Sequence, residues 1–173
     1  MGDSGEFKIL VYLCCKSIVI KFSKMYSFFG KIEAKVDDKG RLFIPSNFRE
    51  QLVTASEKDQ IVIRKNDSGN FLDIYPMSVW NEELAAIESK LNLLNPEHYE
   101  MYMQHTEEAS LLDIDKSGRI LLPKLLAKEL GIENEIVIIG TRSKMALWSR
   151  QRYEENLTNR YEIRNKKIAL LSQ

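Results

Sequence analysis

The sequence VDDKGRLFIPSNFREQL at residues 36–52 returns in a similar form, IDKSGRILLPKLLAKEL, at residues 114–130. One register aligns Asp37 with Asp115, Gly40 with Gly118, Arg41 with Arg119, Pro45 with Pro123 and Leu52 with Leu130, and the apolar positions between them also agree. An internal repeat of this kind indicates a fold built from two related units. Because half of a chain this size buries little apolar surface alone, we expect the halves to pair about a pseudo-two-fold axis and to share strands.

The residues around each copy predict the same local structure twice. Residues 31–36 alternate between polar and apolar, which is typical of a half-buried strand. The Asp and Gly of each copy favour a turn, Arg41 and Arg119 each open a second short strand, and Pro45 and Pro123 each begin a short helix. Hairpins are predicted at residues 60–64 with 71–75 and at residues 135–139 with 145–148.

This order of elements predicts the α+β class, with two tandem, pseudo-symmetric half-domains forming one β-barrel-like core with flanking helices. We assign residues 25–106 to the first half and its helical connector, residues 107–163 to the second half, and residues 164–173 to a flexible tail.

Helical periodicity marks three further segments. An apolar stripe from Trp80 to Leu94 predicts a long helix over residues 76–94, and a second helix is expected over residues 96–106. The second helix is expected to turn Tyr99, Tyr102 and Met103 inward. A final helix, capped by Ser149, is expected to carry Tyr153, Leu157 and Tyr161 on one face. Trp80 and Trp148 are expected to pack in the core.

Composition sets limits on function. The chain has 173 residues, of which 44% are hydrophobic and 29% charged, as in an ordinary globular protein. Its 25 Lys and Arg balance 25 Asp and Glu, so a nucleic-acid site must be a local patch. Cys14 and Cys15 are the only cysteines, which leaves no disulfide framework for the main body and fits a reducing cytoplasm.

Residues 1–24 differ from the remainder of the chain. Their apolar run is too short to span a membrane, and no small-x-small cleavage site follows it. We interpret the segment as an extension that precedes a start at Met25, and we exclude it from the fold prediction.

The repeated Asp and Arg have two interpretations. In the first, their role is purely structural: the Asp closes the turn and the Arg pairs with it on the surface. In the second, two copies place Arg41 and Arg119 on one face, flanked by Lys35, Lys39 and Lys116, where a planar guanidinium suits phosphates and guanine edges.

An enzyme has little support. His98 and His105 lie about two helical turns apart, too far for both to reach one metal ion. No Ser-His-Asp or Cys-His set can be assembled, and Gly40 and Gly118 are lone turn glycines. We therefore expect no catalytic activity, cofactor, metal or small-molecule substrate. A small hydrolase is the last of the functional hypotheses.

At its two D-x-x-G-R-x-x-x-P motifs the chain resembles the MraZ family of bacterial transcriptional regulators, in the SpoVT/AbrB-like swapped-hairpin group. The resemblance covers about residues 25–164 and includes Tyr75-Pro76 with Trp80, and Leu147-Trp148-Ser149. It implies AbrB-like swapped-hairpin half-domains and a closed ring of subunits. It also implies a nucleoid-associated repressor that binds short direct repeats in the promoter of the division and cell-wall gene cluster.

The resemblance makes the Asp-x-x-x-Arg signature the DNA-binding element. We therefore expect Arg41 and Arg119 to contact double-stranded DNA, Asp37 and Asp115 to orient them, and Gly40 and Gly118 to form the turns. Lys35, Lys39 and Lys116 are expected to bind phosphates. Because Asp38 adds an acid to the first turn, we expect Arg41 to be the weaker contact.

A second hypothesis assigns the chain to another class of protein: an antitoxin-like protein-interaction module of the same fold. There the main ligand is a protein, and the helix at residues 76–94 and the apolar residues Ile168–Leu171 would form the partner site.

Overall fold

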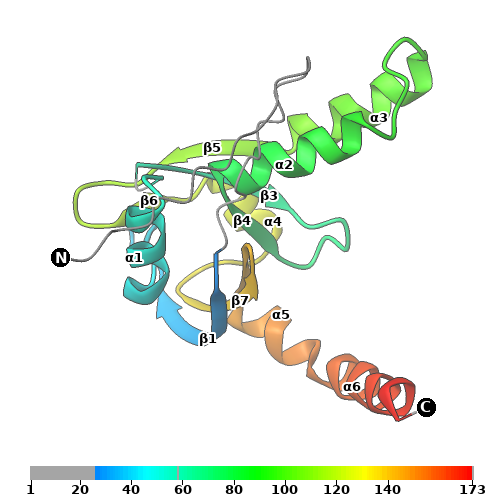
Figure 1. Ribbon diagram of the computed structural model, residues 1–173. Coiled ribbons are helices and arrows are strands. Elements are labelled where there is room, and N and C mark those ends of the chain that lie inside the picture. Colours follow the sequence, from blue (N-terminus) through cyan, green and yellow to red (C-terminus); the bar gives the residue numbers. More distant parts are fainter. Residues whose placement is uncertain (1–25, 58, 173) are drawn as a thin grey trace, which may run out of the picture.

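The computed structural model describes residues 26–57 and 59–172, and residues 1–24 with both cysteines lie outside that part. This part of the chain contains eight strands, in four consecutive pairs, and six helices that follow the pairs; Figure 1 shows their arrangement. The strands are β1 (Phe28–Lys35), β2 (Arg41–Phe43), β3 (Gln60–Lys65), β4 (Leu72–Pro76), β5 (Ala109–Asp113), β6 (Arg119–Leu121), β7 (Glu135–Arg142) and β8 (Met145–Ser149). The helices are α1 (Ser46–Thr54), α2 (Met77–Glu88), α3 (Pro96–Glu107), α4 (Lys124–Glu129), α5 (Arg150–Glu155) and α6 (Leu157–Leu171). The α+β prediction is confirmed.

The two halves exchange their first strands. Six strands form an antiparallel sheet in the order β1-β7-β8-β4-β3-β5. The first strand of each half thus pairs with the hairpin of the other half, β1 with β7 and β5 with β3. The order reads the same from either edge once the halves are interchanged, so a pseudo-two-fold axis passes between β4 and β8, as the repeat predicted.

The prediction of a β-barrel-like core is wrong. The six-stranded sheet is open, with β1 and β5 as its edges, and β2 and β6 form a separate two-stranded ribbon. Each ribbon strand is three residues long and leads into Pro45 or Pro123, which lack the N–H needed to extend the ladder. Strands β2 and β6 therefore pair with each other and do not join the six-stranded sheet to close it.

The sheet separates two layers of packing. On one face lies the main core, where Ile61, Ile63, Ile136 and Ile138 of the sheet pack with Leu42 and other residues of the ribbon, α1 and α4. On the other face, Trp80 of α2 packs with Val62 and Tyr75, and Trp148 packs with Val137 and Tyr153 of α5. This alternation is the period-2 pattern of strands covered on both faces. Both tryptophans are buried, as predicted.

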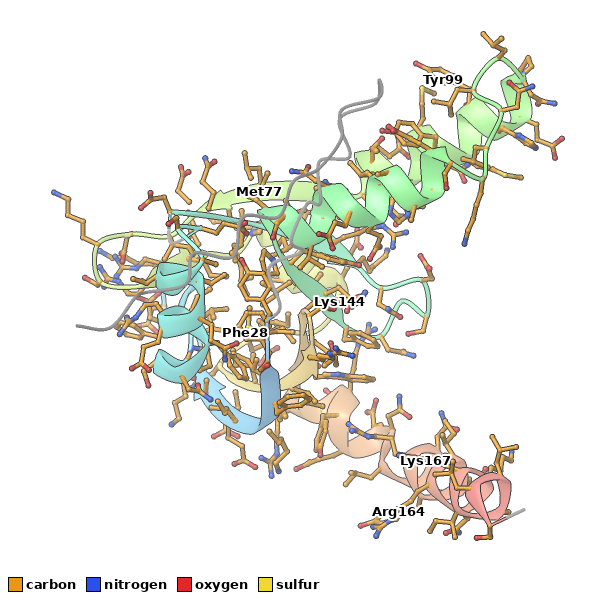
Figure 2. The ribbon with its side chains drawn as sticks, viewed as in Figure 1. Phe28, Met77, Tyr99, Lys144, Arg164 and Lys167 are labelled. Carbon is orange, nitrogen blue, oxygen red and sulfur yellow. The ribbon has the colours of Figure 1, made fainter. Side chains whose placement is uncertain are left out.

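The connector helices differ from the prediction. Helix α2 ends at Glu88, and Leu94 beyond it is 94% exposed. Helix α3 runs back along α2, so that the two helices form an arm projecting from the body (Figure 1). The inward placement of Tyr99 and Met103 is wrong: both are exposed, and Tyr99 lies near the tip of the arm (Figure 2). The half-buried His105 on α3 stacks on Trp80 instead.

The C-terminal helices also depart from the prediction. The single final helix is divided at Asn156 into α5 and α6. Helix α6 continues past residue 164 to Leu171, where a flexible tail was expected, and it leads away from the body (Figure 1). Among the residues that the structure describes, no helix combines the length and apolar character that crossing a membrane requires.

A partly buried polar network joins the α2–α3 arm to the sheet. Lys144 Nζ lies 3.1 Å from Asp73 Oδ2 and donates to the hydroxyl of Tyr75 at 2.8 Å, and that hydroxyl donates to Glu83 of α2. Burial strongly raises the pKa of Tyr75. Partly buried networks of this kind stabilise a fold only when their members find partners.

His105 and Arg64 are the poorly satisfied members of this region, because Nε of Arg64 is also buried without a hydrogen bond among the described residues. Nε2 of His105 is buried and makes no hydrogen bond within the described residues, lying 3.7 Å from Glu83 Oε1. Arg64, which is 6% exposed, pairs with Asp67 and Glu108 nearby. Desolvation, followed by the Arg64 charge, lowers the pKa of His105 from its usual value. His105 therefore remains neutral in the folded protein at neutral pH.

The ribbon yields a stability prediction. Leu42 and Ile120 face the core and are each 1% exposed, so Leu42→Ala or Ile120→Ala should lower the free energy of unfolding by about 2–5 kcal/mol. Phe43 and Leu121 lie beside them on the outer face, each 56% exposed, and their replacement by Ala should change it by about 0.5 kcal/mol. Urea denaturation followed by circular dichroism measures the free energy of unfolding of all four variants. Equal losses of stability for the inner and outer positions would contradict the placement of the ribbon.

His105 yields a prediction on pH. The unfolded chain protonates this residue near pH 6.5, whereas the folded protein resists protonation to lower pH. The unfolded state therefore binds more protons in that window, and stability should fall as the pH is lowered from about 7.5 to 5.5. Thermal denaturation should show a smaller pH dependence for His105→Gln than for the wild type. An unchanged slope would contradict a neutral, desolvated His105.

Candidate nucleic-acid interface

The first repeated turn is closed by Asp37. Its Oδ1 accepts the backbone N–H groups of Lys39 and Arg41, each at 2.9 Å, and its Oδ2 accepts from Nε of Arg41 at 2.8 Å. Gly40 lies at φ +81°, a left-handed conformation that glycine adopts without strain. One carboxylate thus shapes the backbone with one oxygen and holds a guanidinium with the other.

The second turn repeats this arrangement. Oδ1 of Asp115 accepts the backbone N–H groups of Ser117 at 2.8 Å and Arg119 at 3.0 Å, while Oδ2 accepts from Nε of Arg119 at 2.8 Å. Gly118 lies at φ +82°. The predicted Asp–Arg pairing is therefore present in both halves, with matching atoms in matching roles.

The ribbon brings the two turns together. Its register pairs Arg41 with Leu121 and Phe43 with Arg119. Directly paired residues of an antiparallel ribbon point to the same side, so these four side chains share the outer face while Leu42 and Ile120 point into the core. The two arginines thus lie on one face, at opposite ends of a short ribbon. Phe43 and Leu121 complete that face, and the guanidinium of Arg119 lies 5.7 Å from the ring centre of Phe43.

Both aspartates remain ionised. Hydrogen bonding from the backbone N–H of Arg41, and then from its guanidinium, lowers the pKa of Asp37 below its usual range. The backbone N–H of Arg119 does the same, as the largest cause, for the pKa of Asp115. A guanidinium carries five N–H donors, and the Asp engages one edge of it, so each arginine is held in orientation while donors remain for a ligand.

The predicted lysines are placed unequally. Lys39 and Lys116 are exposed within the two turns, two residues before Arg41 and three residues before Arg119. Lys35 is exposed at the end of β1, where it is paired with Glu135 across the sheet, so it lies outside the ribbon. The turns therefore bring together Lys39 and Lys116 with the arginines, and Lys35 contributes from the adjoining strand.

The second turn is braced by a residue that the sequence did not single out. Arg49 of α1, from the other half, donates through Nη1 to the carbonyl oxygen of Ser117 at 2.9 Å. In the repeat register its counterpart is Ala127. Beside the first turn, Ala127 lines a hollow of about 680 Å³, together with Lys39, Lys124 and others. The two turns thus differ in support although their own hydrogen bonds match.

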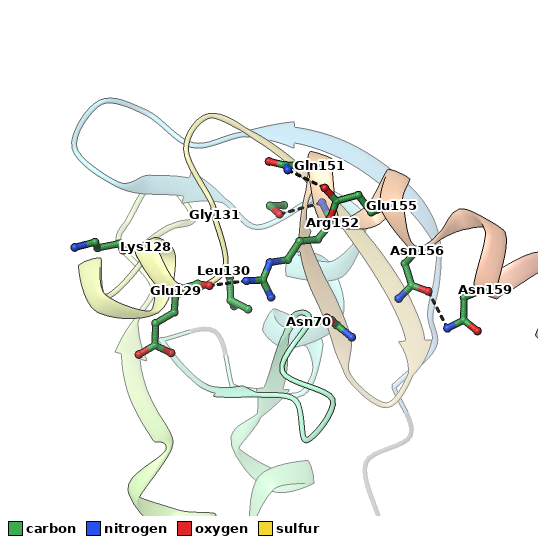
Figure 3. Close-up of a pocket in the computed structure, with 11 residues that line it drawn as sticks. Asn70, Lys128, Glu129, Leu130, Gly131, Gln151, Arg152, Glu155, Asn156 and Asn159 are labelled. Carbon is green, nitrogen blue, oxygen red and sulfur yellow. Dashed lines mark hydrogen bonds between the residues drawn. The ribbon is translucent and has the colours of Figure 1, made fainter.

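Another cavity, of about 650 Å³, lies between α4, β8 and α5 (Figure 3). Arg152 crosses it and donates to the carbonyl oxygens of Glu129 and Gly69, each at 2.7 Å. Its lining is mostly polar or charged, including Asn70, Gln151 and Asn156, and it contains no Cys, His or Asp. Ser149 and Glu155 also line it: Oγ of Ser149 accepts the backbone N–H of Arg152, and Oε1 of Glu155 accepts from Nε2 of Gln151.

Metal-ligating residues do not gather elsewhere in the described structure. Residues 26–57 and 59–172 contain no cluster of three or more His, Cys, Asp and Glu side chains suited to an ion. His98 accepts a hydrogen bond from the backbone N–H of Asn92, while His105 stacks on Trp80, so the two histidines have separate local partners.

Comparison with known proteins agrees with this architecture. A family model described as "MraZ protein, putative antitoxin-like" matches residues 27–101 and again residues 101–169, so each half of the chain is matched once. The two matches fit the tandem repeat.

Several curated relatives carry the name "Transcriptional regulator MraZ". That of Bacteroides fragilis is 40% identical over 131 residues, which cover 76% of this chain and 82% of the relative. That of Bacteroides thetaiotaomicron is also 40% identical, over 76% of this chain and 83% of its own. That of Christiangramia forsetii is 33% identical over 77% and 84% of the two chains. The duplicated Asp–Arg turn, the exchanged strands and these relatives lead to one conclusion: the chain belongs to the MraZ family.

Proposed function

We propose that this protein is a transcriptional regulator that binds promoter DNA through the outer face of the β2–β6 ribbon. The observation that carries the proposal is the pair of equivalent Asp–Arg turns, which presents Arg41 and Arg119 on one exposed face. A surface ion pair contributes little to stability, so stability alone does not account for its duplication in both halves. The names of the relatives support the same role.

The ribbon suits DNA in shape and chemistry. The major groove of B-DNA admits a two-stranded β-ribbon, and arginine recognises guanine through its O6 and N7 atoms. Arg41 and Arg119 are held for such contacts by Asp37 and Asp115. The exposed side chains of Phe43 and Leu121 between them suit apolar contact with thymine methyl groups.

Phosphate contacts complete the interface. Lys39 and Lys116 lie in the turns themselves, with Lys35 on the adjoining strand, so they flank the base-reading face and bind the DNA backbone. The net charge of the chain is zero, so this local patch is the source of electrostatic attraction.

Several linked copies compensate for a weak patch. Joining binding modules raises affinity through effective concentration without any new contact. A closed ring of subunits would present many ribbons to short direct repeats in a promoter. The resemblance to the family supports a more specific role within this proposal, that of a nucleoid-associated repressor at the promoter of the division and cell-wall gene cluster.

The two arginines contribute unequally in this proposal. Asp38 reduces the positive field at Arg41, and the first turn borders a hollow. The second turn has no such extra acid, and Arg49 braces it while adding a positive charge. Both differences favour Arg119 as the stronger DNA contact.

Gel-shift or anisotropy titration with the DNA upstream of the gene tests the proposal. Arg41→Ala and Arg119→Ala should each weaken binding about 10- to 100-fold, with the larger loss for Arg119, and the double variant should lose specific binding. Each change removes a base-reading fork and leaves the core untouched, so circular dichroism should be unchanged.

Arg150→Ala is the matched control, because Arg150 also holds an exposed (i, i+4) ion pair, with Glu154, but lies on α5 away from the ribbon. The Arg150→Ala variant should bind the promoter DNA with the affinity of the wild type. Unchanged affinity in the double variant, or an equal loss in the control, would refute the proposed interface. A larger loss for Arg41 than for Arg119 would refute the assigned ranking.

A further inference from the structure

Two helical projections leave the body from equivalent places in the two halves. The α2–α3 arm follows β4, and the α5–α6 segment follows β8, its pseudo-symmetric counterpart. The two extend in different directions (Figure 1), and Tyr99 on the first and Arg164 and Lys167 on the second lie well away from the body (Figure 2). Within one chain they are not placed to cover each other.

Helix α6 has an apolar and basic face that finds no partner among residues 26–57 and 59–172. Tyr161, Ile168 and Leu171 recur at helical spacing and are 60%, 54% and 74% exposed. Arg164 and Lys167 lie on the same side, whereas Lys166 lies on the opposite side. An isolated helix of this length is marginal in water, and most helical stability in proteins comes from packing of one face. The helix therefore calls for a surface to pack against.

The α2–α3 arm offers a face of opposite charge. On α3, Tyr99 and Met103 are 50% and 39% exposed, and Glu100 and Glu107 lie beside them at helical spacing. Helices α2 and α3 together contain six Glu and neither Lys nor Arg. Helix α6 contains four basic residues and one acidic residue. Both faces thus expose apolar side chains, one among acidic and the other among basic groups.

We propose that α6 of one copy docks on the α3 face of a second copy of this chain. The inference rests on the assembly of several subunits in the proposed function and names the surfaces that make it. Apolar contact between Tyr161, Ile168 and Leu171 on one copy and Tyr99 and Met103 on the next provides the attraction, since it removes exposed apolar surface from water. The charges select this pairing over α3 on α3 or α6 on α6.

The contact joins copies head to tail. It uses a different surface on each partner, so the copy that docks through α6 keeps a free α3 face, and the copy that receives it keeps a free α6. Such a heterologous contact repeats, and it closes into a ring when the rotation between copies permits. The pseudo-two-fold relation of the halves places the donor and acceptor projections on different sides of the body, as this repetition requires.

A charge exchange tests the contact on the full chain without DNA. One variant carries Arg164→Glu and Lys167→Glu on α6, and the other carries Glu100→Lys and Glu107→Lys on α3. Analytical ultracentrifugation should show that each variant alone sediments as a smaller species than the wild type, because its own faces now repel. An equimolar mixture should recover the wild-type size, because each altered face then meets one of opposite charge.

Lys166→Glu is the control for α6, since it alters the same helix on the opposite face, and it should keep the wild-type assembly. Combining all four reversals in one chain should also restore assembly, which separates loss of the contact from misfolding. The inference is overturned if the wild type is monomeric, if either single-face variant keeps its size, or if mixing and combination both fail to restore assembly.

The same variants distinguish other ligands of these surfaces. If the α6 variant keeps its assembly but loses affinity for DNA or for anionic vesicles, α6 binds those ligands and the docking is overturned. Failure of the ribbon variants to affect DNA binding would refute the proposed function, yet it would leave the sedimentation result intact. The two proposals can therefore fail separately.

Discussion

The structure depends on the antiparallel pairing of β2 with β6, through which each half completes the other. Beyond the strands, the backbone N–H of Ile44 donates to the carbonyl of Gly118 at 3.0 Å, and that of Leu122 donates to the carbonyl of Gly40 at 2.9 Å. These bonds fasten each turn to the end of the opposite strand. The buried side chains on the inner face then close the core over the sheet, which neither half could cover alone.

The same pairing determines what the outer face presents. Because side chains alternate along a strand, burying Leu42 and Ile120 forces Arg41, Phe43, Arg119 and Leu121 outward. Asp37 and Asp115 serve the backbone and the guanidinium at once, so the turn cannot form in this way without orienting its arginine. Stability and the proposed DNA recognition would therefore be coupled at the two aspartates, while the arginines lie outside the core.

Much of the fold and of the candidate site was predictable from the sequence. The features that were not predictable depend on contacts between residues far apart in the chain. The repeat predicted the paired halves, the exchanged strands and the Asp–Arg turns, because these follow from local chemistry and from the need of each half for a partner. The exposed positions of Phe43 and Leu121 follow from period-2 alternation starting at Arg41, a signal that was present but not used. The open sheet, the bracing of Ser117 by Arg49 and the outward face of α3 were not predictable, since each depends on where one half meets the other.

Photo-crosslinking tests most directly whether the outer face of the ribbon is the DNA-binding surface. A photoreactive residue, Phe43→p-benzoylphenylalanine or Leu121→p-benzoylphenylalanine, is irradiated with promoter DNA and compared with Tyr99→p-benzoylphenylalanine, which is similarly exposed but lies on the α3 arm. The account predicts efficient crosslinks to DNA at positions 43 and 121 and none at position 99. Crosslinks at position 99 with none at 43 or 121 would contradict it.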